Sequence, residues 1–173
     1  ADPSPIRAAP RAPDIATQPR ERAMTRMAII DFEASCLPED HFSYPIQVSL
    51  TTLEGPSRSW LIKPSAKWQF WDWCDEAEAL HGISREQLGR EGVPVGQVLA
   101  ELAAQAAGCT VYARSDLDAY WLETLAEAAN RPVPFPIRYL GDLFAQGGIE
   151  RQNLLIALET ARMAGHYRYP AAA

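Results

Sequence analysis

The hydrophobic pattern of the chain begins near residue 27 and first predicts strands. Residues 27–30 are a short apolar run, which is typical of a strand that is buried on both faces. Apolar and polar residues then alternate over 46–50, as they do in a strand with one buried face. The turn signal at 54–56 separates this segment from a second extended run over 58–63. We therefore expect a first strand followed by an antiparallel hairpin.

The rest of the chain changes mainly to helical periodicity. Ser84 and Gln87 have the spacing of a capping box, so a short helix should begin there. Pro94 occupies an expected first helical position, and apolar residues then recur every three or four positions until Gly108. The further elements that we expect are a strand over 109–113, a helix whose apolar stripe runs from Leu117 to Leu125, a strand over 137–140, and a helix over 150–164 that Gly165 ends. Asp142, after the strand that ends at Leu140, is expected to act as a cap or to line the sheet edge.

Three leading strands followed by alternating helices and strands predict an α/β fold, with a mixed sheet flanked by helices. A length of 173 residues fits one domain that buries a sizeable core. Residues 1–25 are rich in proline, alanine and arginine and have no apolar period, so they predict a disordered leader. The ordered domain is then expected to span 26–173.

Charge and composition narrow the kinds of partner. The net charge of −6 argues against a protein that coats nucleic acid by bulk positive charge. It is compatible with an enzyme that holds a few nucleotides, because metal-binding carboxylates add negative charge that bound cations offset. No apolar run reaches the length of a membrane span and the first residues have no signal-type apolar core, so we expect a cytoplasmic protein without a membrane partner. The three cysteines, Cys36, Cys74 and Cys109, lack zinc-site spacing and are expected to be reduced and buried.

Two carboxylates at the end of the first strand are the first candidate site. Asp31 and Glu33 are two positions apart, so in a strand both side chains point to the same face while Phe32 packs behind them. Hard cations such as Mg²⁺ prefer oxygen ligands, and phosphoryl transfer commonly uses two such ions about 4 Å apart. The alternative is an acidic strand end that is only solvated.

Four segments in order resemble motifs of DEDD-type 3′–5′ exonucleases. Residues 29–36 are similar to the first motif, and most similar to the Asp-Phe-Glu-Ala-Thr-Cys of exoribonucleases that trim histone-mRNA and small-RNA ends. Residues 79–84 resemble a His/Thr-Gly-Ile-Thr segment of those enzymes, and 118–122 resemble the second motif, Asp-x-x-Phe-Leu. His166 follows a helical pattern and a glycine, like the third-motif histidine of the DEDDh branch, which includes RNase T and proofreading exonucleases. The similarity spans about 27–170.

This resemblance implies an RNase H-like fold and a nuclease that hydrolyses single-stranded nucleic acid from its 3′ end. The implied products are nucleoside 5′-monophosphates, the partner is a single-stranded RNA or DNA 3′ end, the cofactors are two Mg²⁺ or Mn²⁺ ions, and a homodimer is compatible with the pattern. The implied residue roles are metal binding by Asp31, Glu33 and Asp118, proton removal from water by His166, and substrate contact by Phe32, Ala34, His81 and Ile83.

Several of these positions have other interpretations. Ser115 and Asp118 also fit a capping box, so Asp118 could cap its own helix, and Asp116 could be the ligand instead. His166 could be a surface residue after a helix end, and His81 could be structural. The aromatic stretch 68–73 could stack on unpaired bases, although such rings more often close a core.

The last motif of the family does not match fully. The family has an aspartate five residues after the histidine, as a fourth metal ligand, and this chain has Ala171 there. The family also has a further helix, which would lie beyond Ala173. Either the intact protein continues past this point, which is our expectation, or the chain is a degenerate nuclease-fold binding module. An RNase H-like endonuclease is a further alternative.

Overall fold

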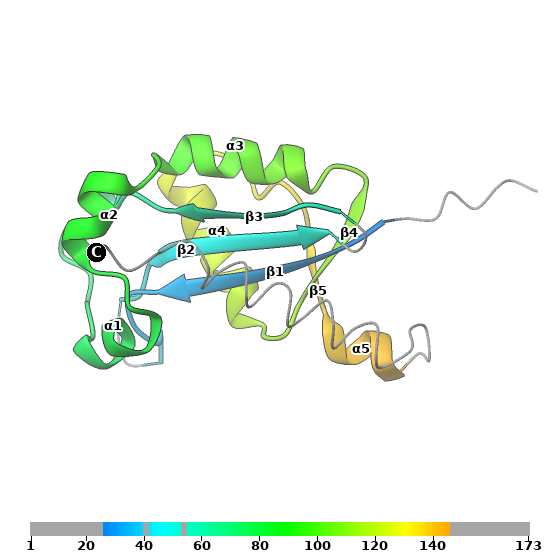
Figure 1. Ribbon diagram of the computed structural model, residues 1–173, viewed down its shortest axis with the longest axis horizontal. Helices are drawn as coiled ribbons and strands as arrows, with labels where there is room; N and C mark the ends of the chain where they lie inside the picture. Colours follow the sequence, from blue (N-terminus) through cyan, green and yellow to red (C-terminus); the bar gives the residue numbers. More distant parts are fainter. Residues whose placement is uncertain (1–25, 40–41, 53–54, 146–173) are drawn as a thin grey trace, which may run out of the picture.

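A five-stranded mixed sheet is the centre of the fold (Figure 1). The computed structural model describes residues 26–39, 42–52 and 55–145. The strands are β1 (Arg26–Ala34), β2 (Pro45–Thr52), β3 (Ser57–Leu61), β4 (Cys109–Ala113) and β5 (Ile137–Tyr139). Their order in the sheet is β3-β2-β1-β4-β5. The first three strands are antiparallel neighbours, whereas β4 runs parallel to β1 and β5 parallel to β4. The predicted α/β class and the hairpin are confirmed.

Helices cover one face of this sheet and one of its ends. The helical elements are η1 (Ala66–Trp68), α1 (Asp75–His81), α2 (Arg85–Glu91), α3 (Val95–Gln105), α4 (Leu117–Ala128) and α5 (Leu140–Ala145). Contacts join α3 to α4 and α4 to both β1 and β2, while α1 and α2 lie beyond the carboxyl end of β1 (Figure 1). The core therefore forms between the sheet and this pair of long helices.

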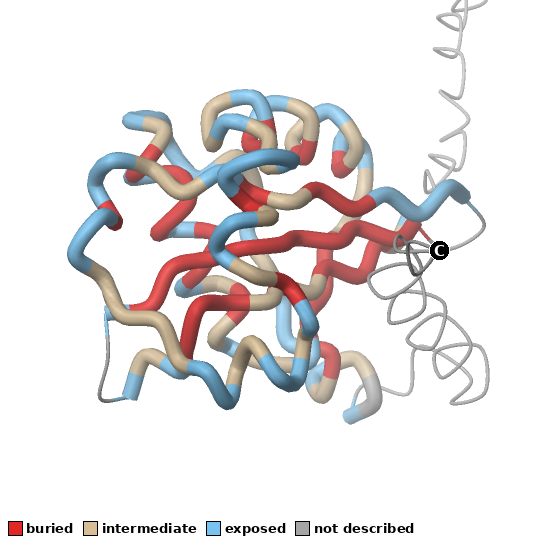
Figure 2. The backbone as a smooth tube through the Cα atoms, turned by 60° about the vertical axis from the view of Figure 1, so that its left-hand side comes forward, coloured by how far each residue is buried: buried red, intermediate tan, exposed pale blue. Residues whose placement is uncertain are grey.

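Strand β2 shows how the core is built. Ile46, Val48 and Leu50 are fully buried and belong to the main apolar cluster. The alternate positions are polar, yet Ser49 and Thr51 are buried as well, so the strand does not have the solvated face that alternation predicts (Figure 2). Hydrogen bonds satisfy these hydroxyls: Ser49 donates to the Asp31 carbonyl and Thr51 pairs with Ser57.

Local signals placed most element ends to within a few residues. The Ser84 hydroxyl accepts from the Gln87 N–H, as predicted, but the Gln87 side chain bonds to Glu91, so only half of the capping box forms. Pro94 is the N-cap of α3 and not its first residue, because its ψ of 139° is extended. Gly108 has a positive φ of 73°, three residues after α3 ends.

One predicted strand end needs correction, and the helices α1 and α5 were not predicted. Leu140 is not the last residue of a strand; it begins α5, and Asp142 lies in the first turn of that helix. Helix α1 was not predicted, because it buries none of its side chains fully and so has no apolar stripe. The expected helix over 150–164 and the leader over 1–25 lie outside the described residues.

The cysteines agree only in part with expectation. All three are free, but Cys74 and Cys109 are half-buried and only Cys36 is fully buried. The fold brings Cys36 and Cys74 together, because the Cys74 N–H donates to the Ser35 carbonyl at 3.0 Å. Burial and the neighbouring Cys36 thiol raise the pKa of the Cys74 thiol. Separately, within the described part of the chain no helix is long and apolar enough to cross a membrane.

Candidate active site

The candidate site lies at β1, the strand at which pairing in the sheet changes from antiparallel to parallel. β2 joins β1 by a hairpin on one side, and β4 joins β1 on the other side after a crossover through the helices. In open α/β sheets, ligands bind at such a switch point, at the carboxyl ends of the parallel strands. Asp31 and Glu33 are in the last part of β1, and Asp118 is in the first turn of α4, directly after β4.

The two carboxylates of β1 share a face, as predicted. Phe32 between them is buried in the core, whereas Asp31 and Glu33 are half-buried on the opposite side of the strand. The Asp31 side chain is 25% exposed and forms an ion pair with Arg114, with 3.1 Å between Oδ1 and Nη2. Arg114 follows β4, and the register Ile29 to Tyr112 places it next to Asp31.

Asp118 is a buried carboxylate that is tied to β1. It is 3% exposed and accepts a hydrogen bond from the Phe32 N–H at 3.0 Å. Burial and then the negative charge of Asp31 raise the pKa of Asp118 to about 7, against the opposing effect of the Phe32 and Ser115 N–H groups and Arg114. The structure thus brings Asp118 close to Asp31. Near neutral pH the Asp118 carboxyl is partly protonated.

Capping explains only part of this arrangement. The N-cap of α4 is Asp116, whose side chain makes no capping hydrogen bond. The Ser115 hydroxyl accepts from the Leu117 N–H at 3.1 Å, and the Ser115 N–H lowers the pKa of Asp118, as the capping box predicts. A cap, however, does not require the hydrogen bond to β1 or burial beside a second carboxylate. Asp116, the alternative ligand, is exposed.

The donor set suits a hard divalent cation, although the described side chains do not form a complete cage. Among residues 26–39, 42–52 and 55–145, no group of three or more His, Cys, Asp or Glu side chains is close enough to hold a metal ion. Carboxylate oxygens are nevertheless the preferred ligands of Mg²⁺ and Mn²⁺. The repulsion between Asp31 and Asp118 is also what a cation would relieve. Asp31, Glu33 and Asp118 are therefore the candidate ligands.

The predicted substrate-contact residues lie around the end of β1, but most point inward. Phe32, Ala34 and Ile83 are buried in the main apolar cluster, so a substrate could meet only their backbone. His81 is half-buried; its Nδ1 accepts from the Ile83 N–H at 3.1 Å, and burial lowers the pKa of the imidazole. This geometry gives Nδ1 a structural role, while Nε2 is buried without a hydrogen-bond partner among the described residues. His166 and Ala171 lie outside the described residues.

In the aromatic stretch 68–73, some rings close the core and one is exposed enough to stack on a base. Trp68 is 3% exposed and stacks on Tyr44 with ring centroids 5.3 Å apart, so it closes the core. Trp71 and Trp73 are half-buried, whereas the Phe70 ring is 87% exposed. Base stacking therefore remains a prediction for Phe70 and not for Trp68.

Sequence reasoning missed Arg114 as a member of the site. Its only local signal is a position at the end of an apolar strand, four residues before Asp118. The ion pair with Asp31 depends on the pairing of β1 with β4, which joins segments more than 80 residues apart.

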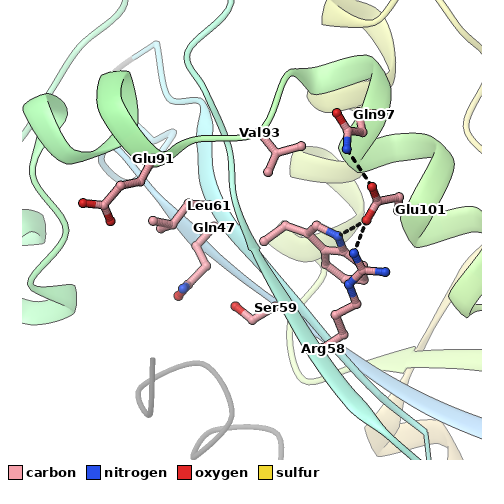
Figure 3. Close-up of a pocket in the computed structure, with 9 residues that line it drawn as sticks. Gln47, Arg58, Ser59, Leu61, Glu91, Val93, Gln97 and Glu101 are labelled. Atoms are coloured by element: carbon pink, nitrogen blue, oxygen red, sulfur yellow. Dashed lines mark hydrogen bonds and ion pairs between the residues drawn. The ribbon is translucent and has the colours of Figure 1, made fainter. Parts of the chain in front are cut away.

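A hollow of about 370 Å³ at the opposite edge of the sheet is not part of this site (Figure 3). It lies along β3, where Arg58 pairs with Glu101 and the Gln97 amide donates to the same carboxylate at 2.8 Å. The Trp60 indole also donates to Glu101, at 2.9 Å, and these hydrogen bonds lower the pKa of Glu101. Arg58 and Glu101 thus satisfy each other within this hollow.

The fold matches that of solved exonuclease I structures. Escherichia coli exonuclease I in complex with a dT13 oligonucleotide has a TM-score of 0.56 and 11% identity, with 74% of this chain and 30% of that chain covered. A moderately thermophilic exonuclease I from Methylocaldum szegediense has a TM-score of 0.54 and 16% identity, over 86% and 37%. A product-bound exonuclease I has a TM-score of 0.56 and 12% identity, over 83% and 41%. No protein-family model and no curated protein matches the chain.

These likenesses establish the architecture. The chain has the RNase H-like sheet that the motifs predicted, in the form found in exonuclease I. It spans between 30% and 41% of the length of the three structures. At such identities the comparison defines the class of fold, and the activity has to be argued from the residues of the site.

Proposed function

We propose that this chain is the nuclease domain of a metal-dependent exonuclease that removes nucleoside 5′-monophosphates from the 3′ end of single-stranded nucleic acid. The observation that carries the proposal is the buried Asp118 carboxylate held beside Asp31 at the switch point of the sheet. The fold supports it, because exonuclease I has the same architecture and one of its structures contains a dT13 oligonucleotide.

The chemistry would be hydrolysis of the terminal phosphodiester. Water attacks phosphorus, the bond to the 3′ oxygen of the preceding nucleotide breaks, and that oxygen leaves with a proton. Two bound Mg²⁺ or Mn²⁺ ions would supply charge stabilisation to the attacking and leaving oxygens. Asp31, Glu33 and Asp118 would hold the ions, and Asp118 must lose its proton to do so. By its resemblance to the third motif, His166 would take a proton from the attacking water.

A binding module with the same fold is the second candidate. Its motivation is Ala171, which replaces the expected fourth aspartate, together with the incomplete ligand group in the described part of the chain. Such a protein would bind single strands without cleaving them. An endonuclease is a third possibility, and it would need no free end.

One experiment separates these candidates. The protein is incubated with a linear single-stranded oligonucleotide and with a circular one of the same sequence, each with Mn²⁺ or with EDTA. We expect mononucleotides from the linear strand only, and only with Mn²⁺. Binding without mononucleotide release would favour the module, and cleavage of the circular strand would favour an endonuclease.

A further inference from the structure

An open hollow of about 460 Å³ lies at the carboxyl ends of β4 and β5. The described residues that line it are Arg114, Ser115, Asp116 and Tyr139. The parallel register pairs Ala113 with Tyr139, so the residues that follow β4 leave the sheet next to the end of β5. Arg114 links the hollow to the candidate metal ligands, because it lines the hollow and forms the ion pair with Asp31.

Arg114 is placed to leave the Asp31 carboxylate and bind a phosphate group instead. Its side chain is 51% exposed, and an ion pair in such a position contributes at most about 1 kcal/mol. A divalent cation on Asp31 would repel the guanidinium that lies 3.1 Å from the same carboxylate, so metal binding would release Arg114. The planar guanidinium fork is well suited to phosphate oxygens.

Tyr139 presents a positioned aromatic ring to the same hollow. The ring is 53% exposed, yet a Cβ added to Gly141 would lie 2.3 Å from its Cε1 atom. The ring thus packs against the backbone of Gly141 and would have to shift if residue 141 carried a side chain. Exposed aromatic rings at nucleic-acid sites stack on unpaired bases.

We infer that this hollow binds a nucleotide next to the carboxylates, with Arg114 on its phosphate and Tyr139 on its base. The inference rests on the proposed function, since the nucleotide would be the terminal unit of the strand or the monophosphate product. The Asp116 carboxylate also lines the hollow and repels anions. The phosphate is therefore expected at the Arg114 side, towards Asp31, and the uncharged base on Tyr139.

The test is calorimetric titration of thymidine 5′-monophosphate and of thymidine into the Mn²⁺-loaded protein. Arg114→Met should weaken monophosphate binding at least about tenfold and leave thymidine binding unchanged, because it removes a charge-assisted hydrogen bond. Tyr139→Ala should weaken both ligands about fivefold or more, and Tyr139→Phe should not. Arg90→Met is the matched control, since Arg90 is an exposed arginine on α2. Thermal unfolding verifies that each variant is folded.

A second measurement uses the metal alone. Without nucleotide, Arg114→Met should bind Mn²⁺ several-fold more tightly than the wild type, because a competing cation has been removed, and Arg90→Met should not. Electron paramagnetic resonance of free Mn²⁺ gives both affinities.

Equal monophosphate affinity in wild type and Arg114→Met, unchanged binding in Tyr139→Ala, or no binding of the monophosphate by the wild type would each overturn the inference. These results are independent of turnover. If the hollow binds the nucleotide as described while oligonucleotides are not hydrolysed, the inference stands and the proposed function fails. If hydrolysis occurs while the nucleotide affinity is unchanged in Arg114→Met and Tyr139→Ala, the proposed function stands and the inference fails.

Discussion

Asp118 in the first turn of α4 accepts a hydrogen bond from the backbone N–H of Phe32 in β1, 86 positions earlier in the chain. This bond fixes the buried carboxylate beside Asp31, although two neighbouring negative charges repel each other. A protein gains nothing in stability from such a pair unless a proton or a cation shares it. In the metal-free protein a proton shares the pair near neutral pH, and a bound cation would take its place.

The first prediction concerns the stability of the metal-free protein. The folded-state pKa of Asp118, about 7, lies above the usual value of about 3.9 in an unfolded chain. The folded state therefore holds a proton that the unfolded state has released, and the free energy of unfolding should fall as pH rises from about 4 to about 7. Asp118→Asn can still accept from the Phe32 N–H, and it should remove this decrease.

Urea unfolding in EDTA at pH 5 and pH 8 measures the effect. The wild type should lose on the order of 1–4 kcal/mol more than Asp118→Asn between the two pH values. Parallel pH profiles in the two proteins would mean that Asp118 is ionised at neutral pH and that the charge of Asp31 is not felt there.

The second prediction concerns metal binding. Asp31→Asn and Asp118→Asn should each weaken Mn²⁺ binding at least about tenfold, because each removes a charged oxygen ligand. Asp116→Asn is the matched control, since Asp116 is exposed and near the same loop. Isothermal titration with Mn²⁺ gives the affinities; a similar loss in all three variants would point to diffuse negative charge and not to coordination.

The third prediction separates the two roles of the aromatic stretch. Trp68→Ala should destabilise the protein by about 3–5 kcal/mol, because Trp68 is buried against Tyr44. Phe70→Ala should change the free energy of unfolding by no more than about 0.5 kcal/mol, because its ring is exposed. If Phe70 stacks on bases, the same variant should bind a single-stranded oligonucleotide more weakly, as fluorescence anisotropy would show.

Local sequence signals were sufficient for the strands, for the longer helices and for part of the site. Alternation and turn residues predicted the hairpin of β2 and β3, and strand geometry predicted that Asp31 and Glu33 share a face. The similarity to the second exonuclease motif singled out Asp118 from Asp116. These predictions depend on neighbours within a few residues, where periodicity is informative.

Long-range features could not be predicted in the same way. The pair Arg114–Asp31 exists because β4 pairs with β1 in one register, and no local pattern encodes that register. At the hollow the Tyr139 ring packs over Gly141 in the first turn of α5, a helix that was not predicted. The buried polar face of β2 likewise reflects tertiary packing that overrides the alternating pattern.

The most direct test of the central claim is the initial rate of mononucleotide release from a linear single strand at saturating Mn²⁺ by Asp118→Asn, compared with Asp116→Asn. If Asp118 is a metal-binding carboxylate of the reaction, its variant should be at least about 100-fold slower, equivalent to about 2.7 kcal/mol of transition-state stabilisation, and it should remain folded. Asp116→Asn removes a negative charge from the nucleotide hollow and no metal ligand, so it should not lower the rate. Wild-type release of mononucleotides by folded Asp118→Asn would contradict the account, and would assign Asp118 to the structure of α4 alone.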